Sequence, residues 1–274
     1  MERKLVGILK SLWRYPVKSM QGEQLESSDI STKGLLGDRA YALWDRQTNR
    51  IASAKNPRKW SSLLDCQAIL EESPQIGQPP PPVRIAFPNG SRVTSEQTDI
   101  DTHLSSWINR KVKFLSAVPE NPSLDQYWPD VEGTAHRDTV TELFMPPGTF
   151  FDSCPIHAIT TATLNRLQQL YPDGEFAPCR FRPNLLIDPQ SSQSGFIEND
   201  WVGHTLAIGD SVKLKVDTAC PRCVVTTLAQ AGLPQDLTIL KTTARYNDII
   251  AGIRLSVVKT GTVNRGDSIW LEKD

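Results

Sequence analysis

Long apolar runs are missing from this sequence of 274 residues. Nowhere do about 18 uninterrupted apolar residues occur, which is the length that a membrane-spanning helix requires. After Met-Glu-Arg-Lys, the apolar residues 5–9 are too few for the core of a signal peptide. We therefore expect a cytoplasmic protein without a membrane partner.

An excess of charge of either sign is missing too. The 30 Lys and Arg residues nearly match the 31 Asp and Glu residues, which disfavours a nucleic-acid partner bound over the whole surface. The sequence also lacks a Walker motif, a Gly-x-Gly-x-x-Gly motif and regular strand–helix alternation. Nucleotide cofactors that bind in those ways are therefore excluded.

Cysteine is sparse and odd in number, with five residues and no export signal. A disulfide framework is not expected under these conditions, so the thiols should be reduced unless they bind a metal or take part in catalysis. The positions of the cysteines are therefore more informative than their number.

Strand-forming sequence dominates the first 118 residues. Residues 5–9 and 12–17 have the β-branched and aromatic content of a strand, residues 40–44 predict a second one, and residues 45–49 are typical of a hairpin tip. Further strands are predicted at residues 67–70, 83–87 and 112–115, with an Asn-Gly hairpin signal at 89–90 and a short helix at 101–108.

A break follows at residues 119–147, which carry five prolines and little periodicity and therefore predict a domain boundary or a long loop. Beyond it, residues 160–170 are amphipathic at helical spacing. Strands are predicted at residues 184–187, 205–208, 212–216, 255–258 and 268–271. The sequence thus predicts a mainly β, α+β protein with a few helices: two β-rich, β-barrel-like subdomains, 1–118 and 119–274, with a cofactor cleft between them.

The segment Cys220-Pro221-Arg222-Cys223 combines two thiols with a cation, which favours the thiolate form that binds metals and acts as a nucleophile. Three interpretations compete. The two cysteines could be small, partly buried structural residues, or a redox pair, although the strand–helix–strand context of thioredoxin-like motifs is missing. They could also bind zinc together with Cys154 and His157 in a Cys₃His set.

Basic residues form a second candidate constellation. Arg14, Lys18 and Arg39 flank turns in the first half, and Arg180, Arg182 and Arg222 flank cysteines in the second. Guanidinium groups match phosphate oxygens bidentately, so their convergence beside a thiolate would suit an anionic, phosphate-bearing cofactor. Each residue taken singly could equally be a solvated surface cation.

At these residues the sequence resembles the MOSC family, named for the C-terminal domain of molybdenum cofactor sulfurase, and within it the group that includes the mitochondrial amidoxime reducing component. The matching stretches, in the family's order, are Tyr15-Pro16-Val17-Lys18-Ser19, Gly34-Leu35-Leu36-Gly37-Asp38-Arg39, Phe181-Arg182-Pro183-Asn184 and Cys220-Pro221-Arg222-Cys223-Val224-Val225-Thr226-Thr227. They span nearly the whole chain and cover an N-terminal β-barrel-like domain and the MOSC domain.

The resemblance implies a molybdenum–molybdopterin cofactor with the Cys223 thiolate as the protein ligand to the metal, and Cys220 as a neighbour. It implies that Lys18, Ser19 and Arg39 hold the pterin and phosphate end from the first domain. Arg182, Asn184 and Arg222 contribute from the second domain. A looser match adds Asp152, as a catalytic residue near the metal, and Ser153.

The implied activity is the reduction of N-hydroxylated compounds such as amidoximes, hydroxylamines and N-hydroxylated bases, with the chemistry supplied by the cofactor. The iron–sulfur domain of some relatives has no counterpart here, so we expect electrons from a separate ferredoxin, flavodoxin or cytochrome b5-like protein. The pyridoxal phosphate domain of the sulfurases has none either, which leaves pyridoxal phosphate binding as a family-level association.

Two other functions stay open at this point. The protein could carry sulfur on Cys223, or store or deliver the cofactor, without turnover. It could also be a zinc-structured interaction module built on the Cys₃His set.

Overall fold

The computed structural model describes residues 3–132, 136–189 and 193–273. In chain order the strands are β1 Arg3–Arg14, β2 Glu23–Leu25, β3 Ser27–Ser31, β4 Gly34–Leu35, β5 Ala42–Asp45, β6 Arg50–Ile51, β7 Gln67–Leu70, β8 Val83–Ala86, β9 Arg92–Thr94, β10 Val112–Leu115, β11 Ser123–Trp128, β12 Thr139–Phe144, β13 Ile156–Thr160, β14 Leu185–Asp188, β15 Thr205–Ile208, β16 Val212–Pro221, β17 Ile250–Lys259, β18 Gly261–Asn264 and β19 Ser268–Glu272. The helices are α1 Pro57–Trp60, α2 Ile100–Ile108, α3 Thr161–Leu170, α4 Pro178–Phe181 and α5 Thr238–Asn247, with 3₁₀ turns η1 Ser61–Asp65, η2 Ile197–Trp201 and η3 Val224–Thr227.

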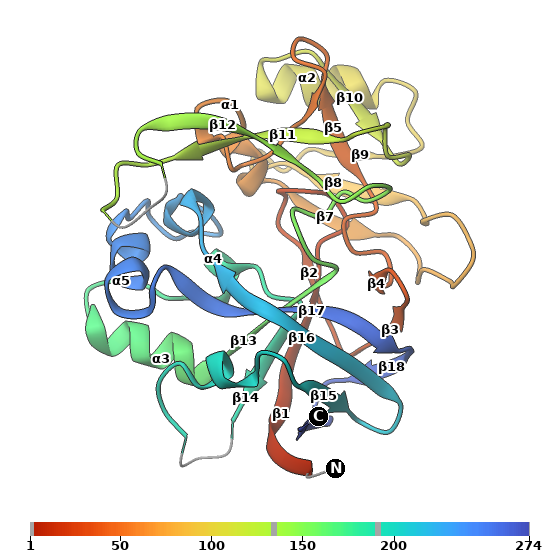
Figure 1. Cartoon of the computed structure of the whole chain (residues 1–274). Coiled ribbons are helices and arrows are strands. Elements are labelled where there is room, and N and C mark those ends of the chain that lie inside the picture. The colour runs from red at the N-terminus through yellow and green to blue at the C-terminus, as the bar shows by residue number, and fades with distance from the viewer. Residues whose placement is uncertain (1–2, 133–135, 190–192, 274) are drawn as a thin grey trace.

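Seven strands close into a barrel in the lower half of the molecule (Figure 1). Their order is β14-β13-β17-β16-β15-β19-β1, and β1 pairs with β14 to close the ring, Leu12 lying opposite Leu185. Closure leaves none of these strands with an unpaired edge. The prediction of a mainly β fold containing a barrel is confirmed.

Apolar side chains fill the barrel, which is therefore a packed core. Leu12, Ile187, Leu214 and Leu255 are fully buried in one cluster. Alternation along β16, where Val212, Leu214 and Val216 are buried and the lysines between them are not, directs one side of the strand inward. The barrel joins both ends of the described chain, because β1 pairs with β19 as well as β14.

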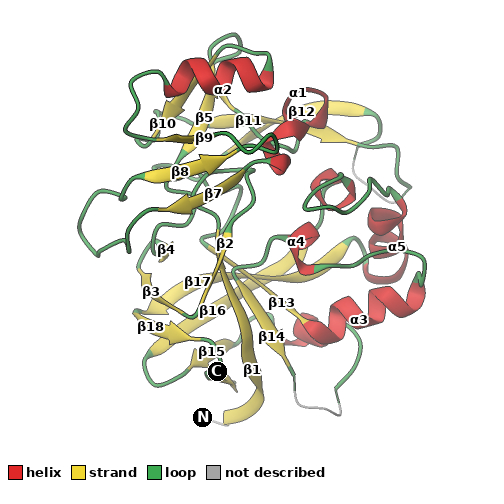
Figure 2. Ribbon diagram, turned by 180° about the vertical axis from the view of Figure 1, so that it is seen from behind, coloured by secondary structure: helices red, strands yellow, loops and turns green. Residues whose placement is uncertain are grey.

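Helices α3, α4 and α5 lie together along one side of the barrel (Figure 2). The helix predicted at 160–170 is confirmed as α3, and Thr160 caps it by accepting a hydrogen bond from the Thr163 amide. The segment of α3 and α4 connects β13 to β14, which is a parallel pair and needs such a crossover. Helix α5 was not predicted.

Small sheets and α2 make up the other half of the molecule. Strands β5, β6 and β10 form one sheet and β7, β8 and β9 another, around a separate core that includes Met20, Trp60 and Ile85. The strands predicted at 67–70 and 112–115 match β7 and β10, and the predicted helix matches α2 within one residue. The boundary between residues 118 and 119 stays a prediction.

The expectation of an irregular loop over residues 119–147 is wrong. Strands β11 and β12 pair antiparallel across this segment, from Ser123 opposite Phe144 to Trp128 opposite Thr139. The five prolines all lie outside the two strands, where the absence of an amide hydrogen does not matter. They flank the two strands, so a high proline content in this segment does not indicate a lack of regular structure.

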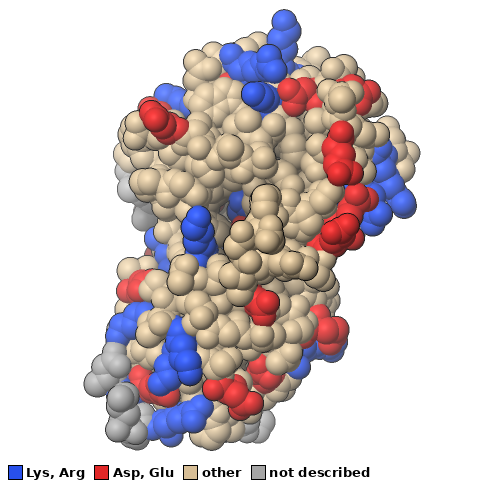
Figure 3. Space-filling view, turned by 90° about the vertical axis from the view of Figure 1, so that its right-hand side faces the viewer, with Lys and Arg blue, Asp and Glu red and all other residues tan. Residues whose placement is uncertain are grey.

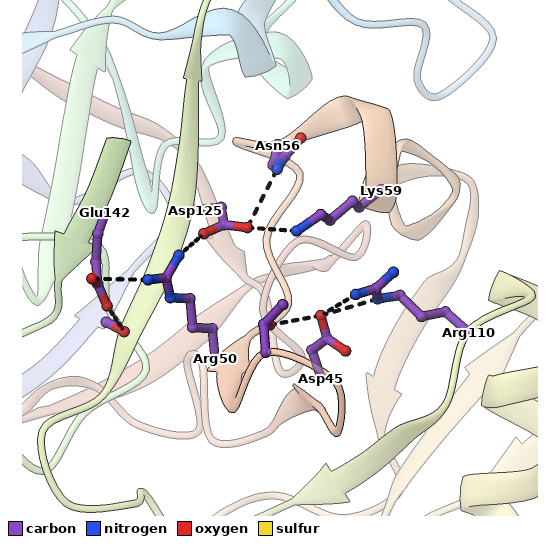
Figure 4. Close-up of polar contacts among 9 residues, drawn as sticks. Asp45, Arg50, Asn56, Lys59, Arg110, Asp125 and Glu142 are labelled. Atoms are coloured by element: carbon purple, nitrogen blue, oxygen red, sulfur yellow. Dashed lines mark hydrogen bonds and ion pairs between the residues drawn. The ribbon is translucent and has the colours of Figure 1, made fainter. Parts of the chain in front are cut away.

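An ion-pair network fastens this hairpin to the neighbouring sheet (Figure 4). The carboxylate of Asp125, on β11, is 8% exposed; it accepts a hydrogen bond from Arg50 and another from Lys59 Nζ at 2.8 Å. Asn56 Nδ2 lies 3.5 Å from the same carboxylate, and Arg50 also bonds Glu142 Oε2 on β12 at 2.9 Å. Burial would raise the pKa of Asp125, but hydrogen bonds from Lys59 and Arg50 lower it overall.

Charges of both signs are interspersed over the face shown in Figure 3, in keeping with the balanced composition. None of the helices in the described part of the chain has the length and apolar content that a membrane crossing requires.

Replacing Asp125 with Asn should destabilise the fold by about 2 kcal/mol at neutral pH, because two cations lose their carboxylate partner. The pKa of Asp125 is depressed in the folded state, so its stabilisation is present above an unfolded pKa of about 3.9 and is lost as the pH falls through the folded value. Urea unfolding of both proteins should therefore show a difference that shrinks below about pH 4. The exposed Asp130, paired with Arg137, gives the matched control Asp130→Asn, for which less than about 0.5 kcal/mol is expected. Equal effects of the two substitutions would contradict the assignment.

Candidate functional site

A pocket between the barrel and the small sheets collects the predicted residues from five distant stretches of the chain. The predicted site residues that line it are Lys18, Ser19, Arg39, Asp152, Ser153, Arg182, Asn184, Arg222 and Cys223. Cys154, His157 and Cys220 also line it, together with Lys55, which the sequence analysis did not single out. The structure therefore brings the cofactor-binding and catalytic residues that the family resemblance implies to one place, whereas Arg14 and Arg180 of the basic constellation do not line the pocket.

Asp152 lies between two buried lysines at one wall of the pocket. Lys18 Nζ donates to Asp152 Oδ1 at 2.5 Å and to the Phe150 carbonyl oxygen at 2.7 Å. Lys55 Nζ lies 3.6 Å from Asp152 Oδ2. Burial would raise the pKa of Asp152, but the two ammonium groups hold it well below its usual range. Burial also lowers the pKa of Lys18, although Asp152 opposes this shift.

Two arginines share the ring of Tyr15 at another wall. The guanidinium carbons of Arg39 and Arg182 lie 4.5 and 4.3 Å from the ring centroid. Asp38 accepts a hydrogen bond from Arg39 and another from the Tyr15 amide at 2.7 Å, which fixes the Asp38-Arg39 turn against the end of β1. Burial raises the pKa of Tyr15 to about 12, so the ring remains neutral.

Three of the predicted cofactor-binding residues have left-handed backbone conformations. The φ angles are +66° at Ser19, +46° at Arg39 and +52° at Arg182, which ends α4. This conformation is strained in residues other than glycine, and strained residues are often found at functional sites. The backbone is thus bent at the points from which these side chains enter the pocket.

Positive charge outweighs negative charge in the pocket. The pocket cations, defined here as Lys18, Arg39, Lys55 and Arg182, face the two carboxylates of Asp38 and Asp152. Burial and repulsion by Arg39 lower the pKa of Arg182 to about 10. Arg182 Nη2 is buried and finds no hydrogen-bond partner among the described residues. A phosphate oxygen would satisfy this donor, so the residues fit an anionic, phosphate-bearing group.

The guanidinium of Arg222 contacts Cys220, three residues before Cys223. Its Nη1 donates to Cys220 Sγ at 3.0 Å and lies 3.2 Å from His157 Nε2, while Nη2 donates to the Phe181 carbonyl oxygen at 2.7 Å. Burial would raise the pKa of Cys220, but Arg222 and His157 lower it well below the usual value. Arg222 therefore acts on the thiol of Cys220, which borders the pocket beside Cys223.

Two other predicted residues also bond the protein's own backbone. Asn184 Oδ1 accepts from the His157 amide at 3.1 Å and Nδ2 donates to the Trp13 carbonyl oxygen at 3.2 Å, joining β13 to β1. Ser19 Oγ accepts from the Ala54 amide at 3.0 Å and keeps its own hydrogen to donate. Ser153 is exposed at the pocket. Asn184 thus fixes the pocket wall with one acceptor bond and one donor bond of its side-chain amide.

The Cys₃His zinc set does not form. Although Cys154, His157, Cys220 and Cys223 all border the pocket, no group of three or more His, Cys, Asp or Glu side chains in residues 3–132, 136–189 and 193–273 is arranged to hold a metal ion. Burial and the neighbouring Cys220 raise the pKa of Cys154 to about 11, which disfavours the thiolate that zinc requires.

Two family models match the parts of the chain that line the pocket. Residues 146–270 match the MOSC domain and residues 6–68 match the MOSC N-terminal beta barrel domain. The chain contains a MOSC domain and a MOSC N-terminal beta barrel domain. The MOSC domain supplies the Asp152, Arg182 and Cys223 walls of the pocket, and the N-terminal match includes Lys18, Arg39 and Lys55.

Distant relatives of this MOSC chain align along nearly all of its length. It is 24% identical to human mitochondrial amidoxime reducing component 2 and 24% identical to human mitochondrial amidoxime-reducing component 1, in each case over 97% of this chain and 83% of the relative. Among solved structures, the YuaD protein from Bacillus subtilis is similar, with a TM-score of 0.49, 12% identity and coverage of 98% of this chain and 97% of that one.

Arg180 and Arg182 should respond to the same substitution in opposite ways. Every nitrogen of the buried Arg180 donates to a backbone carbonyl, of Glu175, Thr226, Leu228 or Pro234, so Arg180→Met should destabilise the protein by about 3 kcal/mol. Arg182 is buried beside Arg39 with an unsatisfied donor, so Arg182→Met should stabilise the cofactor-free protein by about 1 kcal/mol. Urea unfolding of the two variants measures both effects. Destabilisation of equal size in both would show that Arg182 is an ordinary structural residue.

Proposed function

We propose that this MOSC domain protein binds a molybdenum–molybdopterin cofactor in the pocket and reduces N-hydroxylated compounds, with the Cys223 thiolate as the protein ligand to molybdenum. One observation carries the proposal: four sequence stretches, spread from Lys18 to Cys223, converge on a single pocket that combines a thiol with an excess of buried cations. An anionic cofactor with a soft-metal centre needs this combination of groups.

The pocket cations would hold the cofactor's phosphate and pterin end. Arg182 has the buried, unsatisfied donor, and Arg39 lies against the same tyrosine ring. Ser19, with its free hydroxyl hydrogen, and Ser153 and Asn184 at the wall would orient the pterin. Arg222, through its bond to Cys220, would keep the Cys220-to-Cys223 turn in place. When bound, the cofactor supplies two-electron redox chemistry at the metal.

The charged side chains of the pocket indicate which groups would donate hydrogen bonds or protons during such a reaction. Asp152 is held as a carboxylate by Lys18 and Lys55, so it fixes the two ammonium groups and does not itself supply a proton. The Cys223 thiol borders the same space. The chain's own contribution is therefore to bind, to orient and to place proton-bearing ammonium groups beside the reacting oxygen.

Amidoximes and related compounds are the substrate class that the relatives' names support. Each turnover would remove one oxygen as water and consume two electrons and two protons. The electrons would come from a separate carrier, a ferredoxin, flavodoxin or cytochrome b5-like protein.

Elemental analysis of protein from a cofactor-competent host tests the proposal. Wild type should contain molybdenum near one equivalent and reduce benzamidoxime or 6-hydroxylaminopurine with an artificial reductant. Cys223→Ser should lose activity and molybdenum while retaining the unfolding midpoint of wild type, because the thiolate binds the metal and not the core. Cys154→Ser is the matched control, a second pocket thiol whose removal should leave molybdenum bound.

Other results would reassign the protein. Loaded wild type that is inactive on these substrates, with a persulfide on Cys223 in the mass spectrum, would favour sulfur or cofactor transfer. Zinc in place of molybdenum, with unfolding by chelators and a destabilised Cys154→Ser, would favour the zinc-structured module.

A further inference from the structure

Lys55 is a buried cation in the pocket that no sequence motif marks. It lies in a loop between β6 and α1, its side chain is 13% exposed, and it borders the same space as Asp152 and Cys223. Burial would lower its pKa, but attraction to Asp152 and to the thiols of Cys223 and Cys220 raises the pKa overall. The side chain is therefore a protonated donor next to the proposed reaction centre.

Lys55 has spare donor capacity, whereas Lys18 is more firmly bound. Lys18 Nζ makes two short hydrogen bonds, to Asp152 and to the Phe150 carbonyl oxygen. Lys55 Nζ makes one long bond, 3.3 Å to Gln126 Oε1, and its 3.6 Å separation from Asp152 Oδ2 exceeds hydrogen-bond length. An ammonium group has three hydrogens, so Lys55 can turn at least one toward a ligand oxygen.

The β11–β12 hairpin sets the position of Lys55. The Tyr127 amide donates to the Lys55 carbonyl oxygen at 2.8 Å, and Gln126 from the same strand receives the side-chain bond. Asp125, next in sequence, fastens this strand to Arg50 and Lys59 through the network of Figure 4. Lys55 is thus held at the pocket by one backbone bond and one side-chain bond, both to β11.

We infer that Lys55 donates a hydrogen bond to the substrate's N-hydroxyl oxygen and supplies the proton with which that oxygen leaves as water. The inference rests on the proposed function and names the residue that would recognise the oxygen. In the balanced reaction the N–O bond breaks and two electrons from the carrier reduce the nitrogen. One proton, from Lys55, joins the leaving hydroxyl group to give water, and the second proton, from solvent, goes to the nitrogen. Lys55 regains its proton from solvent at the pocket mouth.

Geometry favours Lys55 over its two neighbours for this task. Asp152 is ionised between the two lysines, so it is an acceptor and not a donor. Lys18 Nζ is held by a 2.5 Å bond to Asp152 and a 2.7 Å bond to the Phe150 carbonyl oxygen, which leave only one hydrogen for a ligand and restrict its direction. Lys55 can approach the oxygen while Asp152 steadies its charge from 3.6 Å.

Lys55→Met and Lys55→Arg, compared with Lys113→Met, test the inference in cofactor-loaded protein. Lys113 lies exposed on β10, away from the pocket, and gives the matched control. Calorimetry with benzamidoxime and with benzamidine, which lacks the oxygen, measures binding without turnover. Lys55→Met should weaken benzamidoxime binding by about tenfold or more and should leave benzamidine binding no weaker. Its kcat should fall on the order of a hundredfold.

Lys55→Arg separates hydrogen bonding from proton donation. Arginine keeps the charge and the donors, so benzamidoxime binding should largely recover. Its guanidinium does not give up a proton at neutral pH, so kcat should stay low. Lys113→Met should match wild type in every measurement.

Three results would overturn the inference. The first is benzamidoxime binding and kcat in Lys55→Met that equal those of wild type. The second is an equal loss of affinity for both ligands, which would mean that Lys55 only shapes the pocket. The third is loss of molybdenum from Lys55→Met, which would assign Lys55 to cofactor binding. Failure of the proposed function itself is distinguishable, because wild type would then lack molybdenum or reduce neither substrate.

Discussion

Burial of positive charge between the barrel and the small sheets is the constraint on which the surrounding structure depends. The pocket cations are withdrawn from water, and removing an ion from water is unfavourable unless acceptors lie close by. Asp38 and Asp152 supply these acceptors, Asp38 from a turn fixed to the end of β1 and Asp152 from the segment before β13. The Asp38 turn and the segment before β13 are therefore placed so that their carboxylates lie close to the pocket cations.

The two halves of the molecule contribute differently to this arrangement. The barrel has every strand of its ring paired and a fully buried interior, so Cys220 at the end of β16 and His157 on β13 sit on rigid backbone. The small sheets supply Lys55 on a loop, and that loop depends on the β11–β12 hairpin for its position. The ion pairs of Asp125 therefore help to position a pocket residue, although Asp125 itself does not line the pocket.

Local sequence patterns predicted some of the regular elements and missed others. Strands β7, β10 and β15 have the predicted limits, since each is a short apolar run between turn residues. The β11–β12 hairpin was missed because prolines flank both strands and because the burial of Thr139–Phe144, in which every second residue is exposed, does not follow residue type. The exposed residues of β12 include the apolar Val140 and Phe144, so exposed and buried positions alternate along the strand but polar and apolar residues do not. Periodicity read from residue types could not detect it.

The candidate site was predictable only where residues belong to motifs. Lys18, Arg39, Arg182 and Cys223 could be named because they stand in the four family-like stretches. Lys55 could not, because nothing in Ser-Ala-Lys-Asn distinguishes it from a surface lysine. Its burial and its partners are set by Asp152 and Gln126, about 97 and 71 residues away along the chain. Such contacts exist only once the fold has formed.

Arg180 and Arg182 show why chemistry-bearing residues cannot be ranked by sequence alone. Both are arginines of the same short segment, and both were grouped with the same basic constellation. Arg180 finds four carbonyl acceptors in the segment after β16 and the segment before α4, so every guanidinium nitrogen has an acceptor within the protein. Arg182 shares the Tyr15 ring with Arg39 and keeps a buried donor unsatisfied. A buried guanidinium whose donors all have acceptors stabilises the fold. A buried donor without an acceptor destabilises the fold until a ligand supplies the acceptor. The number of hydrogen-bond acceptors around each guanidinium, and not its place in a motif, therefore distinguishes the two residues. Arg180 stabilises the fold, and Arg182 has a donor available for an anionic ligand.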